Sequence, residues 1–303
     1  MKLTLFARSI ILIFALLFVM GSITPAYSAP EVRVFVEYRV GQQAGVQHTL
    51  KNAGAAFHYK FDELNSFVVS LPESALNGIR RNPNVISVEE DPVRELVRNI
   101  PSKVATITSD SILPDQVVPF GVDMVQARDI WDANRDGRID KKAPTGSGRT
   151  VCIIDTGLYT GHEDFIGVDV KGGYSQTNDD PNLWTFDGYG HGTHVAGTIV
   201  AQNNDYGVVG VTPGTTSLYI VKIFGDDGLW VSKAHASDLI EAANVCAENG
   251  ANIISMSMSG TNKSGKEEKA FNALYAQGIL SVAAASNDGL PDYHYPASYD
   301  SVI

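Results

Sequence analysis

Two different patterns of hydrophobic and polar positions divide the chain. In residues 31–90, short apolar strands and short helical stretches follow one another in the order strand, helix, strand, strand, helix, strand. The strands are expected at residues 32–36, 55–61, 66–71 and 85–88, and the helices at residues 42–52 and from residue 72 onward. This order is typical of a small ferredoxin-like α+β unit.

Beyond residue 116, buried apolar runs alternate with longer helical stretches. The expected strands are residues 151–154, 218–223, 253–258 and 279–284, and the expected helices are residues 191–201, 233–249 and 266–277. Such alternation predicts an α/β fold with a doubly wound parallel sheet, whose ligands gather at the carboxyl ends of the strands. Residues 99–115 are polar and predict an exposed linker that is open to proteolysis and contains the maturation site.

The first 28 residues have the features of a secretory signal peptide. Lys2 and Arg8 precede the apolar run at residues 10–20, and small residues follow as far as Ser28. The run is shorter than the roughly 20 residues that a membrane-spanning helix needs. We therefore expect a secreted, extracellular protein that is cleaved near Ser28.

The composition is that of a folded globular protein: of 303 residues, 44% are hydrophobic, 19% are charged and 2 are cysteine. A formal net charge of −11 argues against a nucleic-acid-binding protein, because phosphate contacts need a basic surface. Cys152 lies in a predicted strand and Cys246 in a predicted helix. A secreted protein could pair them, but our preferred expectation is two free, buried cysteines that pack as small hydrophobic residues.

Two short motifs carry candidate chemistry. Asp155 directly follows the apolar strand at residues 151–154, where a carboxylate is costly unless a partner compensates it. Further along, His191 stands where a Gly-rich turn enters a predicted helix. An aspartate that orients a histidine, which in turn activates a nucleophile, follows the logic of a catalytic triad. Each motif alone is also typical of an ordinary turn or helix cap.

Together, the stretches Val-Cys-Ile-Ile-Asp-Thr-Gly (151–157) and His-Gly-Thr-His-Val-Ala-Gly (191–197) resemble the subtilisin-like serine proteases. The resemblance implies an inhibitory propeptide domain at residues 29–98 and the front part of a catalytic domain at residues 116–303. It implies Asp155 as the triad aspartate and His191 as the general base.

The same resemblance implies an oxyanion site and a substrate cleft. Asn287 would donate its side-chain amide to the oxyanion that develops during acyl transfer. The substrate-binding residues would be Gly228, Ser257, Met258 and Ser259, on a stretch that could pair with an extended peptide as an added strand. Ser259 stands where the family usually has glycine.

Calcium is the expected cofactor, in a structural role. Asp132, Asn134, Asp136 and Asp140 have the spacing of a calcium-binding loop, although Ala143 stands where such a loop usually has glutamate. A polar surface turn explains the same residues.

The resemblance implies a second calcium site. Its side-chain ligands would be Gln116, Asp164 and Asn204, with main-chain carbonyls near Gln202, Tyr206 and Val208.

The third element of the family, a Gly-Thr-Ser-Met-Ala-x-Pro turn with the nucleophilic serine, does not occur in the 303 residues. We therefore expect a fragment of a secreted, calcium-stabilised serine endopeptidase precursor. The parent would be a monomer that acts on proteins or peptides and binds its own propeptide, with no nucleic-acid or membrane partner. Without the serine, the fragment alone is expected to be inactive.

Two other functions remain open at this point. The first is a non-catalytic secreted protein in which the propeptide-like module binds or inhibits proteases. The second is a metallohydrolase in which His191 and His194 bind zinc, although the sequence shows no third ligand of the kind that zinc sites need.

Overall fold

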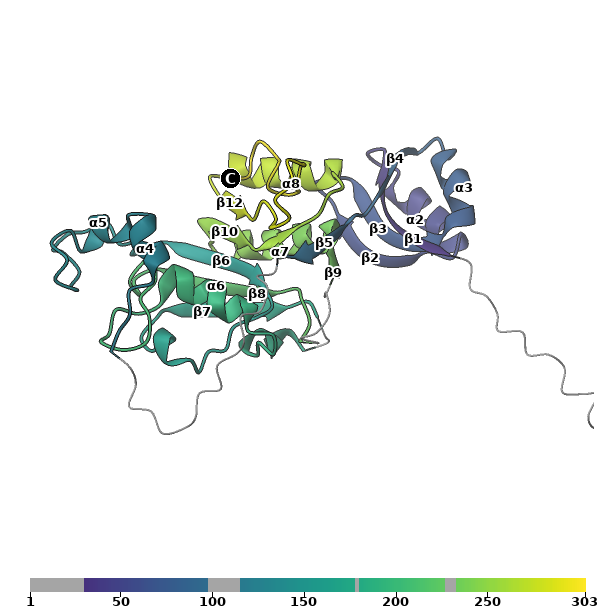
Figure 1. The fold of residues 1–303 in the computed structure, drawn as a ribbon. Coiled ribbons are helices and arrows are strands. Elements are labelled where there is room, and N and C mark those ends of the chain that lie inside the picture. The colour runs from purple at the N-terminus through teal and green to yellow at the C-terminus, as the bar shows by residue number, and fades with distance from the viewer. Residues whose placement is uncertain (1–29, 98–114, 178–179, 227–232) are drawn as a thin grey trace, which may run out of the picture.

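The computed structural model describes residues 30–97, 115–177, 180–226 and 233–303, which form a small N-terminal part and a larger C-terminal part (Figure 1). The N-terminal part contains β1 (Glu31–Tyr38), α2 (Gln43–Asn52), β2 (Ala56–Phe61), β3 (Ser66–Pro72), a 3₁₀ turn η1 (Glu73–Ala75), α3 (Leu76–Arg80) and β4 (Val85–Glu90). Its antiparallel sheet has the strand order β2-β3-β1-β4. The predicted order of strands and helices is confirmed.

Both faces of this sheet are covered. On β1, Val34 and Val36 pack with Leu50 of α2 and Ile79 of α3 in one hydrophobic cluster. Phe35, whose side chain points to the other face because strand side chains alternate, lies in a cluster that includes Ile240 and Ala270 of the C-terminal part. One face of the sheet therefore holds its own helices, and the other docks onto the C-terminal part.

The C-terminal part is built on a five-stranded sheet with the order β12-β10-β6-β8-β7, in which every pairing is parallel. Its strands are β6 (Thr150–Asp155), β7 (Val170–Ser175), β8 (Ser217–Lys222), β10 (Ile253–Met256) and β12 (Leu280–Ala283). Its helices are α4 (Phe120–Met124), α5 (Ala127–Trp131), α6 (His191–Val200), α7 (Ala236–Glu248) and α8 (Gly265–Ala276), with 3₁₀ turns η2 (Glu163–Phe165) and η3 (Pro181–Thr185). The predicted α/β fold with a parallel sheet is confirmed.

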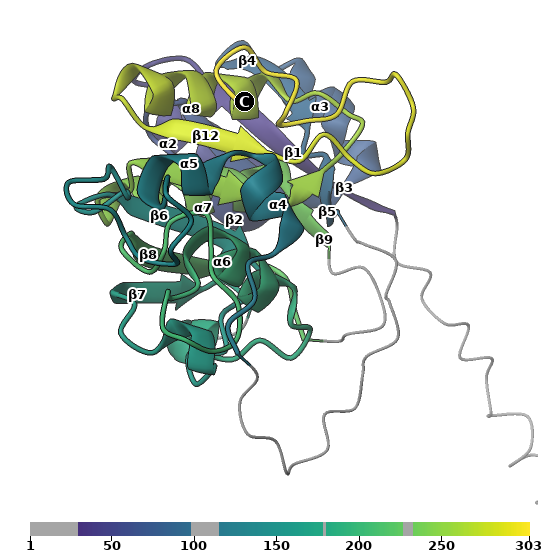
Figure 2. The same cartoon turned by 60° about the vertical axis from the view of Figure 1, so that its left-hand side comes forward.

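Helices lie on both faces of the parallel sheet (Figure 2). Along β6, Ile153 packs with Ala196 of α6, whereas Ile154 belongs to a second cluster that contains Leu239 of α7 and Phe271 of α8. All six residues of β6 are buried. This double coverage explains why the strand reads as one continuous apolar run in the sequence.

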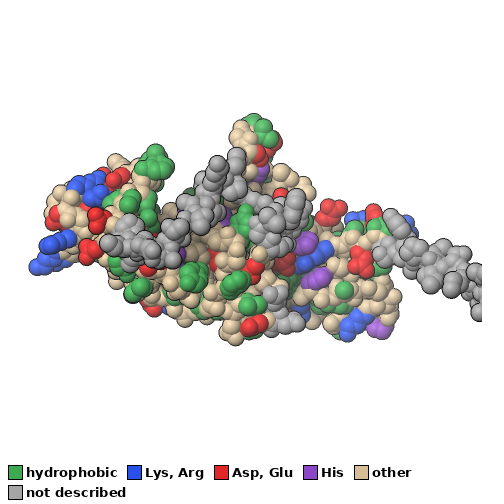
Figure 3. Space-filling model, turned by 60° about the horizontal axis from the view of Figure 1, so that its bottom comes forward, with side chains coloured by type: hydrophobic (Ala, Val, Ile, Leu, Met, Phe, Trp, Pro, Cys, Tyr) green, Lys and Arg blue, Asp and Glu red, His purple; other side chains and the backbone are tan. Residues whose placement is uncertain are grey.

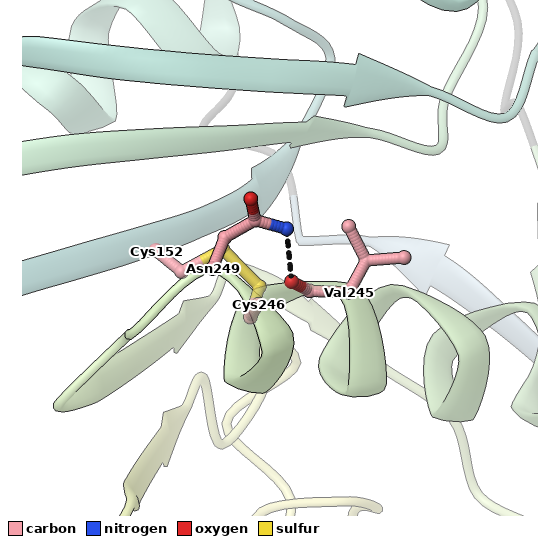
Figure 4. The surroundings of a disulfide bond; sticks show 4 residues. All are labelled: Cys152, Val245, Cys246 and Asn249. Carbon is pink, nitrogen blue, oxygen red and sulfur yellow. Dashed lines mark hydrogen bonds between the residues drawn. A yellow bond between two sulfur atoms is a disulfide. The ribbon is translucent and has the colours of Figure 1, made fainter.

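The expectation of two free cysteines is wrong. Cys152 of β6 and Cys246 of α7 form a disulfide, with their Cα atoms 5.7 Å apart (Figure 4). Both side chains are completely buried, in the cluster between the sheet and α7. Packing of α7 across β6 brings the two Cβ atoms within bonding range, which the sequence positions, 94 residues apart, do not reveal.

A further strand, β5 (Val93–Leu96), was not predicted. It leaves the N-terminal part and forms a three-stranded sheet in the order β11-β5-β9, between β11 (Met258–Ser259) and β9 (Lys233–His235) of the C-terminal part. The helix expected from residue 233 begins only at Ala236, because residues 233–235 pair with β5. The N-terminal part thus inserts a strand into the C-terminal part.

Two carboxylates of the N-terminal part, the buried Asp91 and the partly buried Glu89, cap two helices of the C-terminal part. Asp91 accepts hydrogen bonds from the main-chain N–H (3.0 Å) and the hydroxyl (2.6 Å) of Ser237, at the start of α7. Glu89 accepts one from the hydroxyl of Ser264, the N-cap of α8, at 2.6 Å. Negative charge at a helix N-terminus satisfies free N–H groups and complements the helix dipole. These contacts fix how the two parts dock.

The surface of the described residues carries both signs of charge. On the face shown in Figure 3, acidic and basic side chains are interspersed. Within the described residues, the structure contains no helix long and apolar enough to cross a membrane. The predicted signal peptide and most of the predicted linker, residues 1–28 and 99–114, lie outside them.

Candidate active site

Asp155 and His191 meet at the carboxyl end of the parallel sheet. Asp155 is the last residue of β6, and His191 is the first residue of α6. Nδ1 of His191 lies 2.7 Å from Oδ1 of Asp155. The aspartate side chain is fully buried, and the histidine side chain is 16% exposed. The geometry is that of an orienting carboxylate and a histidine whose second ring nitrogen, Nε2, remains for chemistry.

The glycines of the second motif allow this close approach. A Cβ on Gly192 would lie 2.2 Å from the carbonyl oxygen of Gly157 and 3.2 Å from Cβ of Asp155. Gly190, which precedes the helix, has a φ of +84°, a left-handed conformation that glycine adopts without strain. The first turn of α6 can therefore lie directly against the end of β6.

Asp187 is a supporting residue that the sequence did not point out. One carboxylate oxygen accepts from the Thr156 hydroxyl (2.8 Å) and from the main-chain N–H of Gly190 (2.8 Å). The other accepts from the main-chain N–H (2.8 Å) and the hydroxyl (2.6 Å) of Thr193. Asp187 thereby links the loop after β6 to the start of α6 and fixes the position of His191 relative to Asp155. An acidic residue just before a predicted helix start is the signal that could have indicated it.

The surroundings of His191 favour its charged form. Burial disfavours the imidazolium, but the hydrogen bond and the negative charge of Asp155, and a hydrogen bond to the main chain of Val97, outweigh this effect. The pKa of His191 is therefore raised above its ordinary value. The site stabilises the imidazolium, which is the species a general base becomes when it takes a proton.

Strand β5 ends at this histidine. The main-chain N–H of Val97 donates to the carbonyl of Ser257 at 2.9 Å, and Leu96 and Glu95 pair with Met258 and Ser259 in antiparallel register. Because Val97 also contacts His191 through its main chain, the N-terminal part lies across the site as an extended peptide.

The predicted substrate residues lie along this peptide. Met258 and Ser259 pair with β5, and the carbonyl of Ser257 accepts a hydrogen bond from Val97, the residue that follows β5, so the edge-strand pairing that the sequence suggested is present. Ser259, at the position where the family usually has glycine, is buried against the strand. Gly228 lies outside the described residues.

Asn287 lies at the same site. It follows β12, in a turn where Ser286 has a φ of +78°. Together with Val97 and Ser259, Asn287 lines an open cavity of about 640 Å³ beside β5. His191 and Asn287 therefore both lie near Val97: His191 contacts its main chain, and Asn287 lines the cavity that Val97 also lines.

An oxygen-rich cage surrounds Gln116. Its side-chain nitrogen Nε2 lies within 3.3 Å of four oxygens, namely the carbonyls of Gln202, Tyr206 and Val208 and the side-chain oxygen of Asn204. One amide nitrogen has only two hydrogens to donate, so the acceptors outnumber the donors. Asp164 borders the cage, since its carboxylate accepts from the main-chain N–H of Val208 at 3.2 Å. This donor set fits a hard cation such as Ca²⁺.

The loop that follows α5 is arranged differently. The carboxylate of Asp132 is buried and forms an ion pair with Arg128 at 2.7 Å. Asn134 and Asp136 accept main-chain N–H groups within the loop, and Asp140 accepts from the N–H of Ala133. Within the part of the chain that the structure describes, no three His, Cys, Asp or Glu side chains are grouped to hold a metal ion. The side-chain oxygens of this loop are thus already engaged in hydrogen bonds within the loop and in the ion pair with Arg128.

His191 and His194 are not arranged as a pair. His191 bonds to Asp155, whereas His194, one turn along α6, is exposed.

Comparisons with known proteins agree with this geometry. The model of the subtilase family matches residues 146–303, and the model of the peptidase inhibitor I9 family matches residues 36–97. Subtilisin BL of Lederbergia lenta is 39% identical over 188 residues, which cover 62% of this chain and 62% of that protein. Alkaline elastase YaB of a Bacillus strain is 37% identical over 269 residues, or 89% of this chain and 61% of that protein.

Solved structures show the same fold. The psychrophilic subtilisin-like protease Apa1 of Pseudoalteromonas sp. AS-11 matches with a TM-score of 0.52 and 35% identity, over 62% of this chain and 40% of that chain. Fervidolysin of Fervidobacterium pennivorans matches 92% of this chain and 43% of its own with a TM-score of 0.69, and its 23% identity supports the fold alone. The chain spans between 55% and 62% of the length of the curated relatives described above and of M-protease. With an Asp–His pair at the end of its parallel sheet and an inhibitor domain before it, the chain belongs to the subtilase family.

Proposed function

We propose that the protein carrying this chain is a secreted serine endopeptidase precursor of the subtilisin type, which hydrolyses peptide bonds in proteins or peptides. The observation that carries the proposal is the placement of Val97, at the end of an extended strand, against a histidine that is 2.7 Å from a buried aspartate. An extended peptide bound beside an Asp–His pair is the arrangement that hydrolysis by a catalytic triad requires.

In the proposed mechanism, Asp155 accepts the Nδ1–H of His191 and leaves Nε2 as the base. Nε2 takes the proton of a serine hydroxyl as its oxygen attacks the carbonyl carbon of the scissile bond, and later gives that proton to the leaving amine. Asn287 donates its amide to the oxyanion. In related enzymes such a donor contributes roughly 3 kcal/mol to transition-state stabilisation.

The serine itself is proposed to lie in the part of the protein beyond Ile303. Two facts support this: no Gly-Thr-Ser-Met-Ala-x-Pro turn occurs in the 303 residues, and the chain spans 62% or less of the relatives described above.

Residues 30–97 act as an inhibitor of the same site in the proposal. Strand β5 fills the cleft between β11 and β9, as a substrate would, so a second peptide cannot enter while it is bound. We propose that the maturation cut falls between Val97 and Arg98, which the contact of Val97 with His191 supports. This position is just before the linker at residues 99–115 in which the sequence predicted the cut.

Calcium is proposed to bind in the cage of Gln116, Asn204 and the three main-chain carbonyls, next to Asp164. There it would tie the segment at residue 116 to the loop after α6 and so resist unfolding. The loop with Asp132 is a second proposed site, at which calcium must compete with Arg128 for the Asp132 carboxylate. Secretion through a signal peptide at residues 1–28, a monomeric state and the absence of nucleic-acid and membrane partners complete the proposal.

The test is to express the full-length protein and to measure hydrolysis of an unstructured protein such as casein. We expect hydrolysis that a serine-directed phosphonylating reagent abolishes and that His191→Ala reduces by roughly 10⁴-fold or more. Full hydrolysis by the His191→Ala variant would contradict the proposed mechanism. A full-length protein that binds but does not cleave casein would favour the non-catalytic alternative.

A further inference from the structure

Arg94, in the middle of β5, has its guanidinium completely buried at the interface between the two parts of the chain. Its Nε lies 3.0 Å from Oε1 of Glu267, and one terminal nitrogen lies 2.5 Å from Oε2. Both side chains are fully buried. The hydroxyl of Tyr299 donates to Oε2 of the same carboxylate at 2.8 Å. A bidentate pair of this kind is among the strongest polar contacts in proteins and is specific in geometry.

Apart from the carbonyl of Val93 in β5, which accepts from Nη1 of Arg94 at 3.1 Å, the groups around the guanidinium described here belong to the C-terminal part. Glu267 lies in the first turn of α8, Tyr299 lies near the C-terminus of the chain, and Gly260 follows β11. A Cβ on Gly260 would lie 2.9 Å from the Nη1 atom of Arg94, so this glycine leaves the space that the guanidinium fills. The pocket thus remains on the C-terminal part when β5 departs.

The position of Arg94 on the bound strand is fixed by the register. Glu95 pairs with Ser259, Leu96 with Met258, and the N–H of Val97 bonds to the carbonyl of Ser257. If the bond after Val97 is the one that faces His191, Arg94 is the fourth residue on the amino side of that bond. A substrate that pairs with β11 in the same register places its own fourth residue in the pocket.

An empty pocket leaves a carboxylate without its cation. Burial raises the pKa of Glu267 above its ordinary value, although Arg94 and Tyr299 act in the opposite direction. A buried, unpaired carboxylate is costly, so the pocket favours an occupant that restores the charge and both hydrogen bonds. Arginine does so. Lysine restores the charge but lacks the planar guanidinium that forms both hydrogen bonds at once, and a neutral side chain does not restore the charge.

We propose that Glu267, supported by Tyr299, makes the mature enzyme selective for substrates with arginine at the fourth residue before the scissile bond. The proposal rests on the proposed function, and it names the substrate class of that same cleft. The propeptide carries Arg94 at this fourth position, so the maturation cut would be the first cleavage that follows the preference for arginine.

The test uses the mature enzyme obtained from the full-length protein and four peptides that differ at one position. Each carries Glu-Leu-Val before the scissile bond, and the residue before Glu is arginine, lysine, citrulline or methionine. Citrulline has nearly the shape of arginine without its charge. We expect kcat/KM to be roughly 100-fold higher for the arginine peptide than for the citrulline peptide, with lysine between them.

Variants of the enzyme test whether Glu267 causes the preference for arginine. Glu267→Gln is expected to reduce the arginine-to-citrulline ratio to near one. Glu248→Gln, which removes the same charge from an exposed position at the end of α7, should leave the ratio unchanged. Should Glu267→Gln fail to fold, the peptide series on the unaltered enzyme still decides the question.

The outcomes separate this inference from the proposed function. Equal cleavage of the arginine and citrulline peptides overturns the selectivity and leaves the endopeptidase function standing. A lack of cleavage of all four peptides and of casein overturns the proposed function, and the selectivity falls with it.

Discussion

The Nδ1 atom of His191 lies 2.7 Å from the Oδ1 atom of Asp155, although 36 residues separate them in the sequence. Parallel strands bring this about, because β6 and the loop before α6 reach the same edge of the sheet, where ligands of doubly wound folds gather. Gly192 lets the two elements approach, and Asp187 bonds to both. The pair is therefore held by the fold rather than by its own hydrogen bond alone.

Replacing Asp155 by Asn should lower the pKa of His191, because Asp155 provides a side-chain hydrogen bond and a negative charge that are the largest of the effects raising it. A histidine whose folded pKa is raised contributes stability that is fully present below its unfolded pKa and is lost as the pH rises through the folded value. Asp155→Asn should therefore lower the free energy of unfolding more at about pH 5 than at about pH 9. Urea unfolding at the two pH values measures this. An equal loss at both would contradict the assignment, and Asp62→Asn, at an exposed position, is the control.

The disulfide between Cys152 and Cys246 should contribute substantially to stability. It closes a loop with a sequence separation of 94 residues, and constraining the unfolded chain to this extent contributes about 2–5 kcal/mol. A Cys152→Ala, Cys246→Ala double variant should unfold at a lower urea concentration than the oxidised protein, and its free energy of unfolding should be lower by about 2–5 kcal/mol. Identical unfolding of the double variant and the oxidised protein would show that the cross-link does not form or does not matter.

Asp91→Ala should weaken the docking of the N-terminal part. The substitution leaves the N–H and hydroxyl of Ser237 without their acceptor and removes the partner of Arg33, whose Nε lies 2.8 Å from the carboxylate. Loss of one member of such a buried network costs about 2–4 kcal/mol. The check is the rate at which an added protease digests the N-terminal part. Glu90→Ala, the exposed neighbour, should have little effect, and equal digestion of both variants would argue against the capping role.

Calcium should raise the melting temperature through the cage around Gln116. We expect the increase to be largely lost in Asp164→Asn and retained in Asp136→Asn, which alters only the loop after α5. Differential scanning calorimetry with and without calcium distinguishes the two sites. The reverse pattern would assign the stabilising ion to the loop, and no response in the unaltered protein would remove calcium from the account.

The strand and helix order of both parts could be predicted because hydrophobic residues recur along the sequence at clear strand and helix spacings. β6 and β8 are buried throughout and appear as apolar runs, and α2 was expected within one residue of its observed bounds. β7 was missed because glycines interrupt it. A Cβ on Gly173 would lie 2.4 Å from the Trp184 ring, so the packing of Trp184 requires glycine at this position. Glycine interrupts the apolar pattern by which a strand is predicted, and the sequence alone does not show the packing that requires it.

The site was predictable only in part for a related reason. Asp155 and His191 stand in motifs of recognisable spacing, but β5 is a four-residue strand whose partners lie more than a hundred residues away. Nothing local distinguishes Arg94 from an exposed arginine at a domain boundary. Its burial depends on Glu267, Tyr299 and Gly260, which only the assembled fold brings together.

The most direct measurement of the central claim is the position of the maturation cut. The full-length protein would be expressed and the N-terminus of its mature form determined by mass spectrometry, alongside a His191→Ala variant. The account predicts cleavage between Val97 and Arg98, giving a mature chain that begins at Arg98, and an uncut His191→Ala precursor. A first cut elsewhere, or normal processing of the His191→Ala variant, would contradict the claim that β5 lies in the active site as the enzyme's own first substrate.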